Sequence, residues 1–362
     1  MFKSLLSVLL VSTMSATTSG LQSVGSSNFV DLSPVKSFDF RATGDILVHD
    51  YLYEDVKQDD GSYDFNSRVK SIEPYLKDAD FVYLNQETPI GGEELGLSGY
   101  PTFNAPEEVA DLLEYLHADV VNLANNHILD RSTDGVLKTV ERLKERGIDY
   151  VGANISEEDM NRMRVFLVNG LKVGMSGYTY GTNGIETPEG QDYLVNYDYL
   201  DLILEDVEKL KEVSDVQIIS MHRGVEYAEF PEEADRRMYE QIAEAGVDLI
   251  IASHPHTLQP VDIYETSDGR EVPIAYSMSN FFSAQQTLNT KLGGIFDFEV
   301  KKIGTTVMVP KVRFMPTYVK SNEYEDFNLI PLNDAEMPLV YKDVESHMKT
   351  YTDKLEVVPY LE

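Results

Sequence analysis

Short apolar runs alternate with amphipathic stretches along this sequence, and this alternation limits the possible fold more than any other feature. An apolar run of four or five residues is typical of a buried strand, and apolar residues at helical spacing indicate a helix that covers a sheet. Strands that alternate with helices predict an α/β fold built from βα units. The predicted strands are residues 38–42, 81–84, 120–123, 216–220 and 249–252, and the predicted helices are residues 134–146, 199–213 and 232–245.

Antiparallel strands are expected beside these βα units. Residues 165–168 and 171–177 flank an Asn-Gly pair and predict a hairpin. Residues 294–301 and 306–319 alternate apolar and polar side chains, as half-buried strands do, and are expected to close the sheet.

The beginning of the chain has the composition of an export signal. Residues 1–16 combine one lysine with an apolar stretch too short for an ordinary membrane-spanning helix, which is typical of a signal peptide or a short anchor. Residues 17–37 are rich in serine and threonine and are expected to form a flexible spacer. A domain over residues 38–320 and a polar extension over residues 321–362, with a helix near residues 335–354, complete the expected organisation. The protein is therefore expected to be secreted or tethered at the extracellular surface.

A large negative charge limits the classes of partner. The chain has 62 acidic and 30 basic residues, which gives a formal net charge of −32. A charge of this sign repels nucleic acid and anionic membrane, so no nucleic-acid partner is expected. The chain has no cysteine, so any metal must be held by nitrogen and oxygen ligands.

Potential metal ligands follow the predicted strands directly. Because ligands gather at the carboxyl ends of strands in an open α/β sheet, we expect these side chains to meet at one edge. Imidazoles and carboxylates suit Mn, Fe or Zn, and a carboxylate can bridge two such ions roughly 3.5–4 Å apart. The pattern therefore predicts a site for two divalent metal ions. The segments after the strands contain Asp45, His49, Glu87, Asn126, His127, His222, His254 and His256.

Eight ordered sequence blocks produce a specific resemblance to a known family. Along residues 38–300 they are GDILVHD, NQETPIGG, GYPTFNAPEE, LANNHILD, GYTYGTNG, MHRGVEY, SHPHTLQPV and YSMSNF. The chain resembles the CapA/PgsA family of poly-γ-glutamate capsule biosynthesis proteins, which is similar to the calcineurin-like metallophosphoesterases. The resemblance implies a four-layer αββα sandwich, in which two β-sheets lie between layers of helices.

The resemblance also implies a role for each candidate ligand. One ion would be held by Asp45 and His256, Glu87 would bridge, and the second ion would be held by Asn126, His222 and His254. His49 is a further candidate ligand. His127 would stand beside the metals as a general acid or stabilise charge in the transition state.

Two residues after His222 are candidates for substrate contact or catalysis. Arg223 stands where the family more often has Trp, and its guanidinium could bind a carboxylate or phosphate through two parallel hydrogen bonds. Glu226 is expected to orient a ligand or contact substrate. Glu87 is typical of the capsule family, whereas phosphoesterases have Asp at this position, so the reach of the carboxylate differs from that of an ordinary phosphatase.

Several of these residues also have simpler structural interpretations. Gly-Asp pairs are common in turns, and short polar side chains often cap helices. The structural alternatives are a turn for Asp45, a polar turn for Glu87, and a cap of the following helix by Asp130 or Ser132. His117 and His347 have no neighbouring candidate ligands and are interpreted as structural histidines.

Three functions remain open on this sequence. The first is a capsule-assembly protein that acts on, or helps to export, poly-γ-glutamate or a related anionic polymer. The second is a metal-dependent hydrolase of a phosphoester or an amide, unrelated to capsule. The third is a scaffold without catalysis, bound to the subunits of a membrane capsule synthase. Because the net charge of −32 repels a polyanion, polymer binding would require the metals, Arg223 and nearby lysines to reverse the local field.

Overall fold

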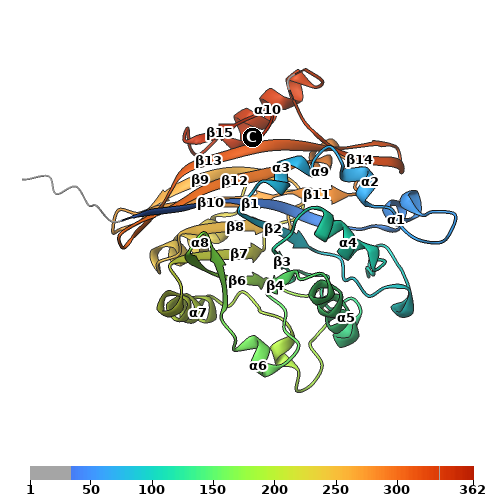
Figure 1. Cartoon of the computed structure of the whole chain (residues 1–362), viewed down its shortest axis with the longest axis horizontal. Helices are drawn as coiled ribbons and strands as arrows, with labels where there is room; N and C mark the ends of the chain where they lie inside the picture. Colours follow the sequence, from blue (N-terminus) through green and yellow to red (C-terminus); the bar gives the residue numbers. More distant parts are fainter. Residues whose placement is uncertain (1–33, 334) are drawn as a thin grey trace, which may run out of the picture. The chain divides into compact units, whose positions relative to one another are not determined.

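Two stacked β-sheets form the centre of the domain, and helices cover both outer faces (Figure 1). The computed structural model describes residues 34–333 and 335–362. The predicted signal segment and residues 17–33 of the predicted spacer lie outside the described residues.

The first sheet combines the N-terminal βα units with the C-terminal strands. Its order is β14-β13-β12-β1-β2-β3-β4, with β11 also paired to β1 and β15 to β13. β1 runs parallel to β2 and β11 and antiparallel to β12. The strands are β1 (Val35–Leu47), β2 (Phe81–Gln86), β3 (Val120–Asn122), β4 (Asp149–Val151), β11 (Asn280–Ser283), β12 (Leu292–Ile303), β13 (Thr306–Asn322), β14 (Glu325–Pro331) and β15 (Leu355–Val357).

The second sheet holds the middle of the chain, in the order β5-β6-β7-β8-β10-β9. The predicted hairpin is confirmed, because β5 and β6 pair antiparallel on either side of the Asn-Gly turn. β6, β7 and β8 run parallel to one another. The strands are β5 (Arg164–Val168), β6 (Leu171–Thr179), β7 (Val216–His222), β8 (Leu249–Ser253), β9 (Leu258–Glu265) and β10 (Glu271–Met278).

Three apolar cores separate the four layers, so the predicted αββα sandwich is confirmed. One core lies between the first sheet and its helices, one between the sheets, and one between the second sheet and α7 and α8. Full burial of one aliphatic or aromatic side chain contributes about 1.5–3 kcal/mol, which makes these cores the main source of stability. The helices are α1 (Asp50–Val56), α2 (Asn66–Val69), α3 (Pro74–Lys77), α4 (Glu108–Tyr115), α5 (Ser132–Glu145), α6 (Glu157–Met160), α7 (Leu200–Val213), α8 (Glu233–Glu244), α9 (Leu288–Lys291) and α10 (Pro338–Met348).

A register shift in β1 changes which side chains face each core. Phe38, Phe40 and Ala42 alternate along the strand and lie in the core between the sheets. The pairing of β1 shifts at Asp45, and Ile46 then belongs to the core beneath the helices. Because side chains alternate with period two, one extra residue exchanges the two faces, and this shift accompanies the entry of β1 into the functional site.

The C-terminal segment is part of the domain, which corrects the prediction of a polar extension over residues 321–362. β14 and β15 both pair with β13, and Tyr341, Val344 and Met348 of α10 are buried in the core. α10 is also shorter than the predicted helix over residues 335–354, since it begins with Pro338 in its first turn, a position that proline favours. At the other end, β1 begins at Val35, three residues before the expected start of the domain at Phe38.

No helix within the described ranges 34–333 and 335–362 is long and apolar enough to span a membrane.

Candidate metal centre

The carboxyl ends of parallel strands from both sheets meet at one site. β1, β2 and β3 lead into it from the first sheet, and β7 and β8 from the second. Asp45 lies inside β1, opposite Asn85 and Asn280, which differs from the expected position after the strand. Gly44 permits this close approach, because a Cβ there would lie 1.8 Å from the Ser279 carbonyl oxygen.

Glu87, His254 and His256 form the centre of the site. One potential ligand atom from each lies within 4.8 Å of the others, and all three side chains are buried. Glu87 Oε1 lies 3.7 Å from His222 Nε2 and 3.9 Å from His256 Nε2. One oxygen of this carboxylate therefore lies near an imidazole at the end of β7 and another in the segment after β8.

Three buried polar atoms of this centre have no hydrogen-bond partner in the part of the chain that the structure describes. They are both carboxylate oxygens of Glu87 and Nδ1 of His254. A buried polar atom without a partner is costly, and it indicates a missing water or ion. The donor set of imidazole nitrogen and carboxylate oxygen suits Mn, Fe or Zn, so these residues fit a metal ion.

Hydrogen bonds connect the remaining candidate ligands to the centre. His256 Nδ1 lies 3.1 Å from Asp45 Oδ2, and Asn85 donates from Nδ2 to Asp45 Oδ1 at 2.7 Å. His222 Nε2 lies 2.8 Å from Asn126 Oδ1. The structure thus brings together six of the predicted metal ligands, hereafter called the metal centre: Asp45, Glu87, Asn126, His222, His254 and His256.

Burial and mutual charge shift the ionisable groups of the metal centre in opposite directions. Burial, followed by the charge of Asp45, raises the pKa of the Glu87 carboxyl well above its usual value. Burial opposes charging of His256, but the negative charges of Glu87 and Asp45 prevail and raise its pKa to about 9. Burial and the neighbouring imidazoles lower the pKa of His222 well below its usual value and that of His254 to about 3. The charged forms of Glu87 and His256 stabilise each other, because His256 acts to lower the pKa of Glu87 while Glu87 raises that of His256.

The backbone that carries the two histidines after β8 adopts conformations that favour glycine. His254 has φ of 105° and His256 has φ of 58°. Such values in non-glycine residues are sparsely populated and concentrate at functional sites, where the surrounding structure maintains them. The conformations direct both rings into the metal centre from a single short segment.

His127 lies beside the metal centre and is held by Asp130. Its Nδ1 lies 2.7 Å from Asp130 Oδ2, and that oxygen also accepts the Phe103 backbone N–H at 2.7 Å. The Phe103 ring packs edge-on against the imidazole at 4.7 Å. A carboxylate that accepts the Nδ1 proton fixes the tautomer and leaves Nε2 as the reactive nitrogen.

Three predicted site residues have other surroundings. His49 is not in the group formed by Glu87, His254 and His256; its Nδ1 lies 3.1 Å from the Leu47 carbonyl oxygen, and burial lowers its pKa to about 4. Arg223 donates from Nε to Asp235 at 2.6 Å and from Nη1 to Asp198 at 2.7 Å. These carboxylates bind two of the guanidinium nitrogens and give Arg223 a structural role, while its contact with substrate stays a prediction. Glu226 is exposed. Burial is the main cause that raises the pKa of Tyr180 to about 12, and the negative charge of Glu226 is the second cause.

Sequence reasoning missed three residues that hold the ligands and His127. Asn85 contacts Asp45, Asn280 Oδ1 lies 3.0 Å from His256 Nδ1, and Asp130 contacts His127. Each has a local signal, because Asn85 lies two residues before Glu87, Asn280 lies in the YSMSNF block and Asp130 is three residues after His127. The sequence favoured only a helix cap for Asp130.

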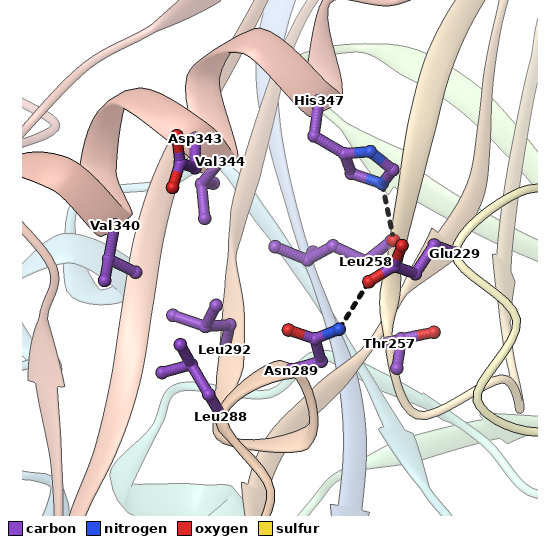
Figure 2. A pocket seen from close by; sticks show the side chains of 10 residues that line it. All are labelled: Glu229, Thr257, Leu258, Leu288, Asn289, Leu292, Val340, Asp343, Val344 and His347. Atoms are coloured by element: carbon purple, nitrogen blue, oxygen red, sulfur yellow. Dashed lines mark hydrogen bonds between the residues drawn. The ribbon is translucent and has the colours of Figure 1, made fainter.

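A separate cavity of about 280 Å³ lies against α10 (Figure 2). Its lining, within the described part of the chain, includes none of the candidate metal ligands. His347 Nε2 points toward the Leu258 carbonyl oxygen at 2.9 Å, and the Asn289 amide donates to Glu229. His117 pairs with Glu73 at 2.7 Å on the surface. Both histidines therefore have the structural contacts expected of them.

Comparisons with known proteins agree with these observations. Residues 39–285 match the family described as "Bacterial capsule synthesis protein PGA_cap". The chain is 29% identical over 277 residues to "Capsule biosynthesis protein CapA" of Bacillus anthracis, covering 73% of this chain and 64% of that protein. It is 26% identical over 266 residues to "PGA biosynthesis protein CapA" of Bacillus subtilis (strain 168), covering 72% and 67%. The chain thus spans less than two thirds of the length of the Bacillus anthracis relative.

Solved structures are more distant. The calcineurin-like phosphoesterase YfkN from Bacillus subtilis is 20% identical with a TM-score of 0.47, covering 88% of this chain and 99% of that one. The 5'-nucleotidase precursor from Thermus thermophilus is 13% identical with a TM-score of 0.48, covering 87% and 59%. Because the family match extends over more than half of the sequence, this chain belongs to the bacterial capsule synthesis family.

Proposed function

We propose that this chain is a metal-dependent hydrolase of capsule assembly that acts on an anionic polymer of the poly-γ-glutamate kind. Membership of the capsule synthesis family and the names of the two Bacillus relatives support the polymer. The chemistry rests on a single observation. The Glu87 carboxylate is buried among imidazoles, and neither of its oxygens has a partner in the described part of the chain.

The metal centre offers ligands for two divalent ions. Asp45 and His256 form one hydrogen-bonded pair near Glu87, Asn126 and His222 form another at 2.8 Å, and His254 belongs to the central group. Ions held there supply Lewis acidity and lower the pKa of water toward neutrality. Because the ligands must lose their protons to bind, the proton held at His256 has to leave, and metal affinity should rise with pH.

His127 is the side chain of this site best placed to move a proton. Asp130 holds its Nδ1 side, so Nε2 is the nitrogen that can donate a proton to a leaving oxygen or nitrogen. Neither residue belongs to the metal centre. His127 therefore serves as general acid, and Asp130 positions it. Glu226 is exposed near this site and is a candidate for contact with substrate.

We also propose that the folded domain works outside the membrane, secreted or tethered, beside the subunits of a capsule synthase. The apolar stretch in residues 1–16 and the serine- and threonine-rich residues that follow support this location. Protease added to intact cells should then remove the protein while a cytosolic marker survives. Equal protection of both proteins would contradict the location.

Turnover by the full chain tests the proposed reaction. The protein is loaded with Mn²⁺ and offered a γ-linked glutamate oligomer or a generic phosphodiester, each with a metal-free control. Cleavage of the glutamate oligomer alone, dependent on metal, is the expected result. Cleavage of the phosphodiester alone would replace the polymer by a phosphoester substrate. Cleavage of neither, with metal bound, would favour a scaffold without catalysis.

A further inference from the structure

A cavity of about 310 Å³ opens beside the metal centre. Four separate segments line it: the start of α1, the segment after β7, the segment between β11 and α9, and the turn between β13 and β14. The side chains that matter here are Tyr51, Tyr227, Gln285, Gln286 and Tyr324. We call this space the tyrosine cavity.

The lining of the tyrosine cavity is neutral. It consists of three tyrosines, two glutamines, two threonines, one histidine and one alanine, and no Asp, Glu, Lys or Arg of the described chain is among them. The cavity against α10, by contrast, has Glu229 and Asp343 in its wall. A wall that also lacks cations offers no counter-charge to an anionic polymer. The lining instead favours an uncharged ligand with many hydrogen-bonding groups.

Two tyrosines form an aromatic platform on one side of the cavity. The rings of Tyr51 and Tyr324 lie 4.4 Å apart at 31° to each other. The two residues remain 49% and 48% exposed although their rings contact each other. Because the two rings already contact each other, a planar nucleobase cannot insert between them. Their exposed surface is apolar with a polar hydroxyl at its edge, which suits contact with a ligand that is itself apolar on one face and polar at its rim.

Tyr227 connects the cavity to the metal centre and is held in a strained conformation. Its φ is 66°, a left-handed value that is an outlier for a bulky residue. The backbone N–H donates to the Pro255 carbonyl oxygen at 2.7 Å, between the two histidines of that segment, and the ring lies 6.1 Å from His256. The side chain is nonetheless 56% exposed, so the strain does not serve core packing. Strain of this kind is maintained where it positions a functional group.

Gln285 provides a second connection to the metal centre. Asn280 donates from Nδ2 to Gln285 Oε1 at 3.0 Å, and Asn280 Oδ1 lies 3.0 Å from His256 Nδ1. One short chain of hydrogen bonds thus runs from the cavity wall to a candidate metal ligand. A ligand in the cavity is therefore adjacent to the reactive site.

We propose that the tyrosine cavity is a subsite for a neutral glycan. A pyranose ring has apolar C–H faces that pack on aromatic rings, while its hydroxyl and acetamido groups lie at the rim, within reach of glutamine and threonine side chains. A γ-glutamate chain carries a carboxylate on every unit and finds no cation in this wall. The proposal goes beyond the proposed hydrolysis and does not depend on it, because none of the cavity tyrosines belongs to the metal centre.

Calorimetric titration of the metal-free full chain tests this subsite, with tetra-N-acetylchitotetraose as the neutral probe and a γ-linked glutamate tetramer as the anionic one. The neutral tetramer should bind, and added salt should change its affinity little. Tyr51→Ala and Tyr324→Ala should each weaken binding by about tenfold through loss of the ring contact. Tyr51→Phe keeps the ring and should bind nearly as well as the parent.

A matched control is available at Tyr360, which is 51% exposed and stacked on Tyr75 at 6.1 Å. Tyr360→Ala removes an equally exposed stacked tyrosine and should leave binding unchanged. The proposal is overturned if neither tetramer binds at millimolar concentration, if the glutamate tetramer binds more tightly, or if Tyr360→Ala weakens binding as much as Tyr51→Ala. Because binding is measured without metal or turnover, a failure of hydrolysis and a failure of this subsite are distinguishable.

Discussion

Two buried polar clusters share strand β1, and they differ in how many hydrogen-bonding groups remain without a partner. In the arginine cluster (Arg41, Asp297 and Arg313), Arg41 donates from Nε to Asp297 Oδ1 at 2.9 Å and Arg313 donates from Nε to Oδ2 at 2.8 Å. The metal centre begins only four residues after Arg41, at Asp45. There, among the residues described, the two Glu87 oxygens have no partner.

Burial does not distinguish the two clusters, because Asp297, Asp45 and Glu87 are all fully buried. Saturation does. The remaining nitrogens of Arg41 are also used, since Nη1 donates to the Tyr75 carbonyl oxygen and Nη2 to that of Glu362. Buried groups that are hydrogen-bonded to one another can hold strands together, whereas buried carboxylate oxygens without a partner leave lone pairs that a ligand can use. A buried charge therefore indicates function here only when its hydrogen bonds are counted.

Removal of Asp297 should produce the largest effect on the fold. Asp297→Ala removes the buried carboxylate that pairs with both Arg41 and Arg313, so the free energy of unfolding should fall by about 3–5 kcal/mol in urea titrations. Glu271→Ala removes the partner of Lys354 in an exposed pair and serves as the control, with little expected change. If both variants shift the unfolding midpoint equally, the buried ion pairs of the arginine cluster do not stabilise the fold more than an exposed pair does.

His127→Ala should affect rate and leave metal content unchanged. Loss of a general acid lowers turnover by roughly 10²–10⁴-fold, and Asp130→Asn should lower turnover in the same direction because the ring loses its fixed tautomer. Asp45→Ala, inside the metal centre, should instead lose metal and turnover together. Elemental analysis beside a rate assay separates these results. A His127→Ala protein that has lost as much metal as Asp45→Ala, or retains full turnover, would show that the roles are wrongly divided.

Glu87→Gln should separate metal binding from folding. The amide has the shape of the carboxylate, so the metal-free protein should keep its free energy of unfolding within about 1 kcal/mol. Mn²⁺ at a hundredfold excess over its dissociation constant should stabilise the parent by about 2.7 kcal/mol for each ion bound, and the variant far less. Thermal unfolding with and without Mn²⁺ measures the difference. Equal stabilisation of both proteins would remove Glu87 from the metal centre.

Asn85→Ala should have the smallest of these effects. Loss of a side chain that orients a ligand typically lowers metal affinity by roughly 10–100-fold without unfolding the protein. Asn328→Ala is a control for loss of an asparagine side chain away from the site, since the half-buried Asn328 lies on β14, three strands from β1 in the first sheet. Metal titration of both variants gives the comparison. Identical affinities would mean that the contact between Asn85 and Asp45 is not needed to position the ligand.

Local patterns predicted the strands, the main helices and the residues of the metal centre, whereas the four layers were implied by the family resemblance. Four of the five apolar runs that were predicted as strands lie within β1, β2, β7 and β8. The fifth run, residues 120–123, extends one residue beyond the end of β3. The ligands that follow them meet because neighbouring parallel strands end at the same edge. These features depend on spacing within a few residues, which a sequence displays directly.

Pairings between segments far apart in the sequence were not predicted, because no pattern within a few residues specifies them. The C-terminal segment looks polar in sequence, but β14 and β15 complete the sheet by pairing with β13. Arg223 was expected to face substrate, and its partners Asp198 and Asp235 come from segments 25 and 12 residues away. The register shift that places Asp45 inside β1 likewise depends on strands that the local sequence does not specify.

The ion pair between Arg41 and Asp297 joins residues 256 positions apart, and this separation determines how early during synthesis the pair can form. At roughly 5–20 residues per second, a ribosome adds Asp297 on the order of ten to fifty seconds after Arg41. Until then β1 lacks β12 along one edge, and contacts of such high sequence separation form slowly even once the chain is complete. A nascent chain with this topology therefore lacks the pairing of β1 with β12 until the last third of the domain is being synthesised.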